Sequence, residues 1–510
     1  MPPPVKLAII GGGPSAFYVA SRLLSLLPLG DPISPPLRVH MYDRLWAPHG
    51  LVRYGVAPDH PEVKVSVNIF MSSKQQLGHL QNCTNKFDAT ATDPRFRFFG
   101  NVNVGNTALR SIPHALPLPL PSILKNYSHL LFATGCTLPT LHPAIPPSVY
   151  CIPALSLVHW YTRHPSQPPP PALDKISHVT LIGNGNVSLD IARILLTSPS
   201  VLRHYDVPEH VLEVLSRSTV KHVSIVGRRG PLESAFTTKE LREMINLPEA
   251  SMIPIEPSLL TPPPGVTPTR QQRRTLELLQ KGSKNPPGST PKTWELHFYR
   301  SPTSLTPPST DSAPDMANLT LAHTRLDPTT SRAVSTGETS TLPTSLVVTS
   351  LGFHADPETT FFDPVLSHLR SSAGRITSSE GLPLKNVYAS GWAANGAKGV
   401  LASTMMDAYA VADTIISDIV PPTDGVKLNS TSSVLATGTA SDELLNPRPD
   451  LDALPAEIVH GIRDGMVTQY SDWTAVGAEE VRRGETLGKE RERLGWEEAR
   501  SFIALSRARS

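Results

Sequence analysis

Two stretches of the chain share one order of apolar and polar positions. In the first, residues 7–10 form a continuous apolar run, typical of a buried parallel strand, and glycines 11–13 follow. Residues 17–27 then repeat apolar side chains at helical spacing, and a second apolar run at 37–42 ends in Asp43. The second stretch has an apolar run at 179–182, a glycine turn at 183–185, a helical pattern from about Val187 and a second run at 223–226. The pattern predicts two strand–turn–helix–strand units.

The first glycine turn predicts a site for a dinucleotide. Gly11 and Gly13 let the backbone approach a pyrophosphate, and Pro14 and Ser15 open a helix whose N-terminus attracts it. Ala16 replaces the third glycine of the usual fingerprint and is small enough for close packing of helix on strand. An acid at the end of the second strand accepts hydrogen bonds from free ribose hydroxyls. Asp43 therefore favours FAD in this unit.

The second unit ends differently, in Arg228 and Arg229. A guanidinium offers planar paired donors and stays charged, which suits a phosphate rather than a hydroxyl. We therefore interpret this unit as an NADP(H) site, with the two arginines on the 2′-phosphate. The alternative is that Arg228 and Arg229 form a solvated turn or salt bridges.

Composition limits the other possibilities. A length of 510 residues suggests two to four domains, and the net charge of +2 gives no global field toward nucleic acid or a membrane surface. The cysteines at 83, 136 and 151 have no CxxC spacing, so neither a redox disulfide nor a cysteine-ligated cluster is expected. No membrane span, signal peptide or metal site is predicted. Four proline clusters, at 165–171, 257–268, 302–314 and 421–422, suggest surface insertions or linkers.

Three further stretches fit a two-dinucleotide flavoprotein. Residues 130–135 and 346–353 each suggest a strand ending in a small residue and a glycine, of the kind that joins two such domains. Residues 387–389 suggest a strand, 391–399 a loop and 400–416 a helix. The positive N-terminal end of that helix is suited to the N1/O2 edge of a flavin.

Five segments of the chain resemble those of a known family. The segments GLVRYGVAPDHPEVK (50–64), GNVNVG (100–105), GNGNVSLDIARILL (183–196), VGRRGPLESAFTTKELREM (226–244) and SGWAANGAKGV (390–400) resemble adrenodoxin-type ferredoxin–NADP reductases. The likeness extends to residues 471–494. It implies two interleaved Rossmann-like domains as in glutathione reductase: FAD domain 1–136, inserted NADP domain 137–349, and FAD domain again at 350–510. A proline-containing insertion is expected near 420–450.

The resemblance also implies the site residues. FAD contacts are expected at Ser15, Asp43, Leu51, Val104, Trp392, Gly399, Val400 and Leu401. NADP contacts are expected at Asn184, Gly185, Asn186, Val187, Arg228, Arg229 and Glu240, with Gly399 shared near the nicotinamide. His60 and Asp190 match a water-linked polar network near the flavin, and they are the residues assigned to the catalytic centre.

Several of these residues also have ordinary structural explanations. Glu240 lies three residues after Thr237, the spacing of a helix capping box. Asp190 near a helix start compensates the helix dipole, and His60 in a tight turn suits a structural hydrogen bond. Ser15, Asp43 and Asn184 also depart from the usual residues of the family at their positions, which we interpret as tuning.

The family implies hydride transfer from NADPH to FAD, followed by single-electron transfer to a small acidic [2Fe–2S] ferredoxin. A basic dock is expected at Lys239 and Arg242, with Arg203, Arg217 and Lys221 near in sequence. The expected protein is a monomer of the mitochondrial matrix, either free or peripheral at the inner membrane, and it binds no nucleic acid. Rival functions are a flavin monooxygenase or an amine or sulfide oxidoreductase on the same fold, and a non-catalytic NADP-sensing scaffold.

Overall fold

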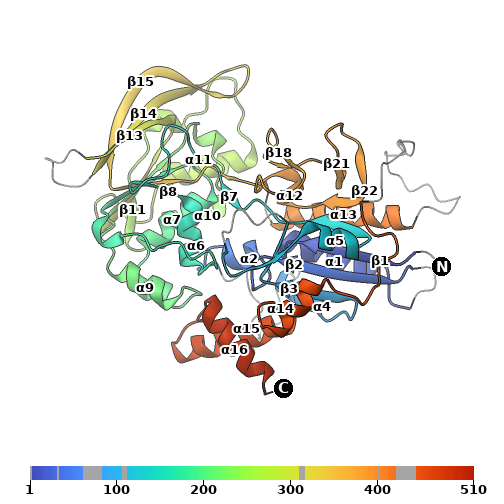
Figure 1. Cartoon of the computed structure of the whole chain (residues 1–510). Helices are drawn as coiled ribbons and strands as arrows, with labels where there is room; N and C mark the ends of the chain where they lie inside the picture. Colours follow the sequence, from blue (N-terminus) through green and yellow to red (C-terminus); the bar gives the residue numbers. More distant parts are fainter. Residues whose placement is uncertain are drawn as a thin grey trace, which may run out of the picture.

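The computed structural model describes residues 3–30, 34–60, 83–105, 112–308, 316–399, 401–420 and 444–509. Within these ranges, two large sheets with parallel strands lie in two lobes side by side (Figure 1). Helices cover both sheets, so the predicted α/β class is confirmed. The strands of the second sheet come between two strands of the first in the chain, which makes the two units interleaved.

The first lobe is built on a seven-stranded sheet. Its strand order is β20 (Ser371–Ser372), β21 (Arg375–Thr377), β22 (Pro383–Ala389), β6 (His129–Phe132), β1 (Val5–Ile10), β2 (Leu37–Asp43) and β3 (Phe96–Gly100). The strands from β22 to β3 are parallel. One face packs on α1 (Pro14–Leu26), α4 (Cys83–Ala91) and α13 (Leu401–Ile419). The other carries β4 (Val102–Val104), β5 (Leu116–Leu118), α5 (Leu120–Asn126) and α14 (Ala456–Arg463).

The second lobe is built on a six-stranded parallel sheet. Its order is β11 (Ala250–Met252), β12 (Lys292–His297), β10 (His222–Val226), β9 (His178–Ile182), β16 (Leu346–Thr349) and β8 (Cys151–Pro153). Its largest core cluster includes residues of α6 (Ala154–Tyr161), α7 (Asn186–Leu196), α8 (Pro199–Leu202), α9 (Glu209–Ser216), α10 (Thr238–Ile245) and α11 (Arg270–Lys281). The other face packs on an antiparallel meander of β13 (Arg300–Thr306), β14 (Ala317–Leu326) and β15 (Ala333–Thr344).

Two connections link the lobes. β7 (Leu138–Pro139) follows β6 and pairs antiparallel with β17 (Phe353–His354), which follows β16. The short pair β18 (Phe362–Asp363) and β19 (His368–Leu369) comes next in the chain. The outgoing and returning segments therefore run side by side, as an inserted domain requires.

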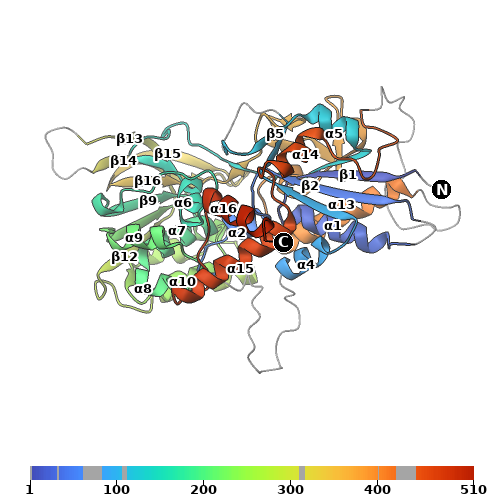
Figure 2. The same cartoon turned by 60° about the horizontal axis from the view of Figure 1, so that its bottom comes forward.

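The C-terminal helices α15 (Tyr470–Thr486) and α16 (Trp496–Arg507) lie across the junction of the lobes (Figure 2). Glu480 of α15 is fully buried and binds Arg53 of the first lobe through two hydrogen bonds of 2.7 and 3.0 Å. Arg493, between the helices, binds buried Asp206 of the second lobe, with one contact of 2.8 Å. The end of the chain thus holds both lobes.

Several sequence expectations need correction. The strands at 130–135 and 346–353 end earlier, at Phe132 and Thr349, and the joining role falls to β7 and β17. The expected loop at 391–399 contains the short helix α12 (Trp392–Asn395). Prolines 302–314 are not simply an insertion, because Pro302 lies in edge strand β13 at a register shift. Residues 309–315 and 421–443 of the proline-containing stretches lie outside the described residues.

Candidate functional site

Two adjoining cavities lie at the carboxyl ends of β1, β2 and β6. Both are lined by Gly11, Asp43, Arg44, Thr134 and Thr137. Because open α/β sheets bind ligands at this edge, the shared cavity is where a dinucleotide belongs.

The structure brings most of the predicted FAD residues to these cavities. One cavity is lined by Gly11, Gly13, Pro14, Ser15, Asp43, Leu51, Trp392 and Leu401. The other adds Val104 to Gly11 and Asp43. Gly399 is exposed and has a φ of +85°, whereas Val400 lies outside the described residues.

The glycine turn leaves no room for side chains at its first two positions. Gly11 has a φ of +108°, and a Cβ atom there would lie 2.3 Å from the Ala133 carbonyl oxygen. A Cβ atom on Gly12 would lie 2.5 Å from Asp43 Oδ2. A Cβ atom on Gly13 would meet no atom within 4 Å, so space remains beside the start of α1. The turn therefore fits a pyrophosphate at the N-terminus of this 13-residue helix.

Asp43 is held by the backbone around it. Its Oδ2 accepts a hydrogen bond from the amide of Gly12, and its Oδ1 accepts one from the amide of Leu45, both at 3.0 Å. Burial raises the pKa of Asp43 to about 6, although the Leu45 and Gly12 amides and the charge of Arg44 oppose the rise. A carboxylate has about four acceptor positions, so capacity remains for ribose hydroxyls.

The far end of the cavity is formed by the chain after β22. Ser15 and Ser390 share a buried hydrogen bond of 2.6 Å between their hydroxyl oxygens. The indole of Trp392 donates to the Lys398 carbonyl at 3.0 Å, which fixes the loop before Gly399. This part of the cavity fits a flavin ring beside Trp392 and the start of α13.

Two cavity-lining histidines were missed by the sequence reasoning. His159 of α6 and His164 stack with ring centroids 3.7 Å apart, and both contact the Ser166 hydroxyl. Burial, and to a lesser extent the charge of Arg44, lowers the pKa of His159 to about 3. Burial also holds the pKa of His164 well below its usual range, so both histidines are neutral at physiological pH. No sequence signal indicates it, because α6 belongs to the second lobe.

The second glycine turn is held against the segment that follows β10. The Asn184 carbonyl accepts hydrogen bonds from the amides of Ala235 and Phe236, and Asn186 Oδ1 accepts one from the Thr237 amide at 2.8 Å. A Cβ atom on Gly227 would lie 2.7 Å from Asn184 Nδ2.

This turn has free space beside it and a donor without a partner among the described residues. A Cβ atom on Gly185 would meet no atom within 4 Å, and Val187 follows in the first turn of α7. The Asn184 Nδ2 group is buried and has no hydrogen-bond partner among the described residues. A donor in this position fits a phosphate or amide group of a bound nucleotide.

Arg228 and Arg229 follow β10 after Gly227, as expected. Arg228 is exposed and Arg229 half-buried, and their carbonyls accept hydrogen bonds from the Thr324 hydroxyl and the Tyr299 amide. Within the part of the chain that the structure describes, neither guanidinium forms a salt bridge. The salt-bridge alternative is therefore not what the structure has.

A second group of polar residues lies where the lobes meet, centred on buried Arg193 of α7. Arg193 binds Asp59 through hydrogen bonds of 2.6 and 3.0 Å and Asp190 at 2.9 Å. It also lies 3.1 Å from Glu240 Oε2 and 3.2 Å from Glu243 Oε2. We call Asp59, His60, Asp190, Arg193, Glu240 and Glu243 the interlobe cluster.

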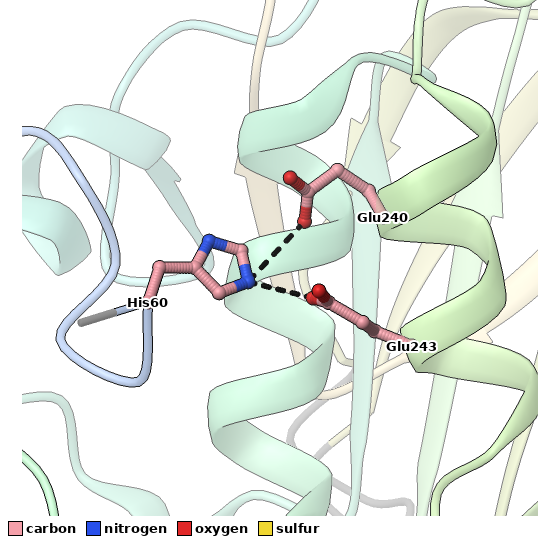
Figure 3. Close-up of side chains that lie close together, drawn as sticks. All are labelled: His60, Glu240 and Glu243. Atoms are coloured by element: carbon pink, nitrogen blue, oxygen red, sulfur yellow. Dashed lines mark hydrogen bonds and ion pairs between the residues drawn. The ribbon is translucent and has the colours of Figure 1, made fainter. Parts of the chain in front are cut away.

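His60 completes this cluster from the first lobe (Figure 3). Its Nε2 atom lies 2.6 Å from Glu243 Oε2 and 3.7 Å from Glu240 Oε2. Burial and the charge of Arg193 oppose protonation, but the hydrogen bond with Glu243 and the charges of Asp190 and Glu240 together outweigh them, so the pKa of His60 is raised. Burial and the charge of Asp190 raise the pKa of Glu240 to about 7.

The two residues assigned to the catalytic centre, His60 and Asp190, thus meet in one cluster. The sequence reasoning did not find Arg193, Asp59 or Glu243. The spacing of Asp190 and Arg193, three apart on a helix, was the available signal.

Glu240 needs one correction. Thr237 Oγ1 accepts a hydrogen bond from the Glu240 amide, but the Glu240 carboxylate turns to Arg193 and His60. Only half of the expected capping box therefore forms.

The predicted dock lies on α10. Lys239 and Arg242 are both exposed there, with Lys239 Nζ 3.9 Å from Glu243 Oε1. Arg203, Arg217 and Lys221 are exposed too. Among the described residues, no helix has the length and apolar character needed to cross a bilayer.

The chain is similar in sequence and in fold to known reductases. No family model matches the chain. The human protein "NADPH:adrenodoxin oxidoreductase, mitochondrial" is 35% identical over 512 residues, covering 96% of this chain and 90% of that protein. "NADPH-ferredoxin reductase FprA" of Mycobacterium tuberculosis strain H37Rv is 32% identical over 438 residues, with 84% and 87% covered. The structure of M. tuberculosis FprA in complex with NADPH superposes with a TM-score of 0.76 at 29% identity, covering 98% of this chain and 100% of that one.

Proposed function

The chain belongs to the adrenodoxin-type ferredoxin–NADP reductases, which are FAD-dependent oxidoreductases, and we propose that it passes electrons from NADPH to a [2Fe–2S] ferredoxin of the adrenodoxin type. The observation that carries the proposal is the pair of glycine turns at two parallel sheets. One turn is followed by an acid and the other by two arginines with no salt bridge among the described residues.

The residues present fit the two cofactors of the family, FAD and NADP(H). Gly11, Gly13 and the start of α1 would hold the FAD pyrophosphate, and Asp43 the adenosine ribose. When bound, FAD accepts a hydride from NADPH and releases electrons one at a time. We propose that five further residues lining the same cavities also contact FAD: Ser15, Leu51, Val104, Trp392 and Leu401.

We assign the nicotinamide dinucleotide to the second turn. Asn184 to Val187 would meet its pyrophosphate, and Arg228 and Arg229 its 2′-phosphate, where paired charged donors are most effective. The interlobe cluster lies between the lobes. Its role is to hold charge and water at the junction of the two sites rather than to take a proton from substrate, since hydride transfer needs no base.

The acceptor is proposed from what the chain offers beside the flavin. Its three cysteines have no CxxC spacing, so electrons leave directly to an external carrier. Helix α10 turns Glu240 and Glu243 toward His60 and exposes Lys239 and Arg242. An acidic ferredoxin would meet those two cations near the junction of the lobes.

Domain limits, oligomeric state and location are part of the same proposal. The limits 1–136, 137–349 and 350–510 fit the point where β7 leaves the first sheet and β17 returns. The human relative's name includes "mitochondrial". We propose a monomer in the mitochondrial matrix, either free or peripheral at the inner membrane.

The test is NADPH-driven reduction of cytochrome c with and without an added adrenodoxin-type ferredoxin. We expect reduction that depends on the ferredoxin, while ferricyanide is reduced without it. NADPH oxidation whose rate depends on an organic substrate and not on ferredoxin would instead support a monooxygenase or a related oxidoreductase. A purified protein without flavin absorbance would support a scaffold.

A further inference from the structure

Three potential metal ligands converge in the interlobe cluster. His60 Nε2, Glu240 Oε2 and Glu243 Oε2 face one another, and a set of one ligand atom from each residue lies within 4.8 Å (Figure 3). His60 comes from the chain after α2 (Leu51–Tyr54), while both glutamates come from α10. Imidazole and carboxylate are ligands that zinc accepts in proteins.

The spacing is close to what an ion requires. Ligands about 2.0–2.2 Å from a tetrahedral zinc ion are separated from one another by roughly 3.3–3.6 Å. The His60–Glu243 distance of 2.6 Å would have to lengthen and the His60–Glu240 distance of 3.7 Å to shorten. Both changes are below about 1 Å, which rotation of the glutamate side chains supplies.

The charge of the cluster also favours a cation. Four carboxylates, from Asp59, Asp190, Glu240 and Glu243, face the buried positive charge of Arg193, and the exposed Lys239 adds one cation 3.9 Å from Glu243. Burial of such an excess is costly unless a proton or an ion neutralises it. Arg193 keeps two hydrogen bonds to Asp59, so it need not hold either glutamate.

A route from solvent exists as well. The Glu243 side chain is 31% exposed, compared with 8% for His60 and 11% for Glu240. A water molecule entering on that side would provide the fourth ligand of the ion.

We propose that His60, Glu240 and Glu243 form a binding site for a divalent transition-metal ion of the Zn²⁺ type. The ion takes the place of the proton shared by His60 and Glu243, so binding releases protons. Because its ligands come from both lobes, the ion ties the segment after α2 to α10. Since His60 is also one of the residues assigned to the catalytic centre, the bound ion disturbs the polar network there and acts as a reversible inhibitor of turnover rather than as a cofactor.

The experiment titrates the FAD-loaded enzyme with Co²⁺, which gives visible bands at wavelengths beyond the flavin absorption when its coordination is tetrahedral. We expect one Co²⁺ per chain, displaced by Zn²⁺, with proton release on binding. Zn²⁺ should slow ferricyanide reduction, and EDTA should restore it. Glu240→Gln, Glu243→Gln and His60→Gln should each weaken binding by at least roughly 10–100-fold, the loss that even outer partners of a metal ligand cause.

A matched control separates this site from other histidine–glutamate contacts. Glu295 lies 3.0 Å from His222 Nε2 and 2.8 Å from His297 Nε2 on the second sheet. Glu295→Gln should bind Co²⁺ as the parent does. The proposal is overturned if the parent shows no saturable bands, if the three ligand variants bind like the parent, or if Glu295→Gln removes binding. Retained flavin absorbance identifies which ligand variants are folded. A single folded variant of the three is enough to test the proposal.

Discussion

Changing Arg228 and Arg229 to glutamine should abolish the preference for NADPH over NADH. The two residues follow β10 after Gly227, which packs against Asn184 of the glycine turn, and they have no competing salt bridge among the described residues. Glutamine keeps a donor and much of the length but removes the charge. The change therefore acts on the 2′-phosphate and leaves the rest of the nucleotide site in place.

The magnitude follows from the exposure of the two residues. Hydrogen bonds to charged groups contribute about 1.5–3 kcal/mol each. Arg228 is exposed and Arg229 half-buried, so solvent screening favours the lower figure for both. Together they give about 3 kcal/mol, and since 1.4 kcal/mol corresponds to a factor of ten, the ratio of KM for NADPH to KM for NADH should rise roughly 100-fold.

The assay is steady-state ferricyanide reduction with each nucleotide, which needs no ferredoxin. Arg448→Gln, an exposed arginine of the first lobe, serves as the matched control and should leave both KM values unchanged. If the double variant raises KM for NADH as much as for NADPH, the arginines support the fold or the common part of the nucleotide. The assignment of the 2′-phosphate would then be wrong.

Three further changes test the flavin site, the ferredoxin dock and the buried Arg53–Glu480 ion pair. Asp43→Ala should loosen FAD by about 1.5–3 kcal/mol without altering NADPH preference, measured as flavin retained on gel filtration in mild denaturant; equal retention would count against a ribose contact. Reversing Lys239 and Arg242 to Glu should slow ferredoxin reduction by roughly 10-fold or more at low salt and spare ferricyanide reduction. A matching loss with ferricyanide would refute the dock. Glu480→Gln leaves the charge of buried Arg53 unpaired and should lower the free energy of unfolding by about 3–5 kcal/mol in urea denaturation; a loss under about 1 kcal/mol would contradict this.

Local pattern was enough to predict the dinucleotide units. Apolar runs, glycine turns and the residues after the second strands are all short-range features, and the structure places β1, β2, β9 and β10 within two residues of expectation. The proline clusters were less reliable for predicting insertions and linkers. Pro302 lies in β13 because an edge strand with a register shift tolerates a residue that lacks an amide donor.

The interlobe cluster could not be found in this way. Asp59 and Arg193 are 134 positions apart, and their contact depends on how the lobes are placed. Glu240 illustrates the same limit: its spacing from Thr237 matches a capping box, yet the nearby charge of Arg193 and the ring of His60 compete successfully for its carboxylate. Charge contacts within the second lobe and between the lobes override the local helix signal here.

The relative placement of the lobes is therefore specified by buried charge. Arg193 with Asp59, Arg493 with Asp206 and Arg53 with Glu480 are ion pairs whose side chains are at most 9% exposed. Such pairs contribute little net stability compared with apolar contacts, but breaking one is costly. They therefore favour one relative placement of the lobes over slightly displaced ones. Hydride transfer requires the reacting atoms to lie about 3–3.5 Å apart, and a displacement of 1 Å costs roughly 100-fold in rate. With one cofactor site assigned to each lobe, strict geometry at the junction serves this chemistry better than a purely apolar interface, which can slide.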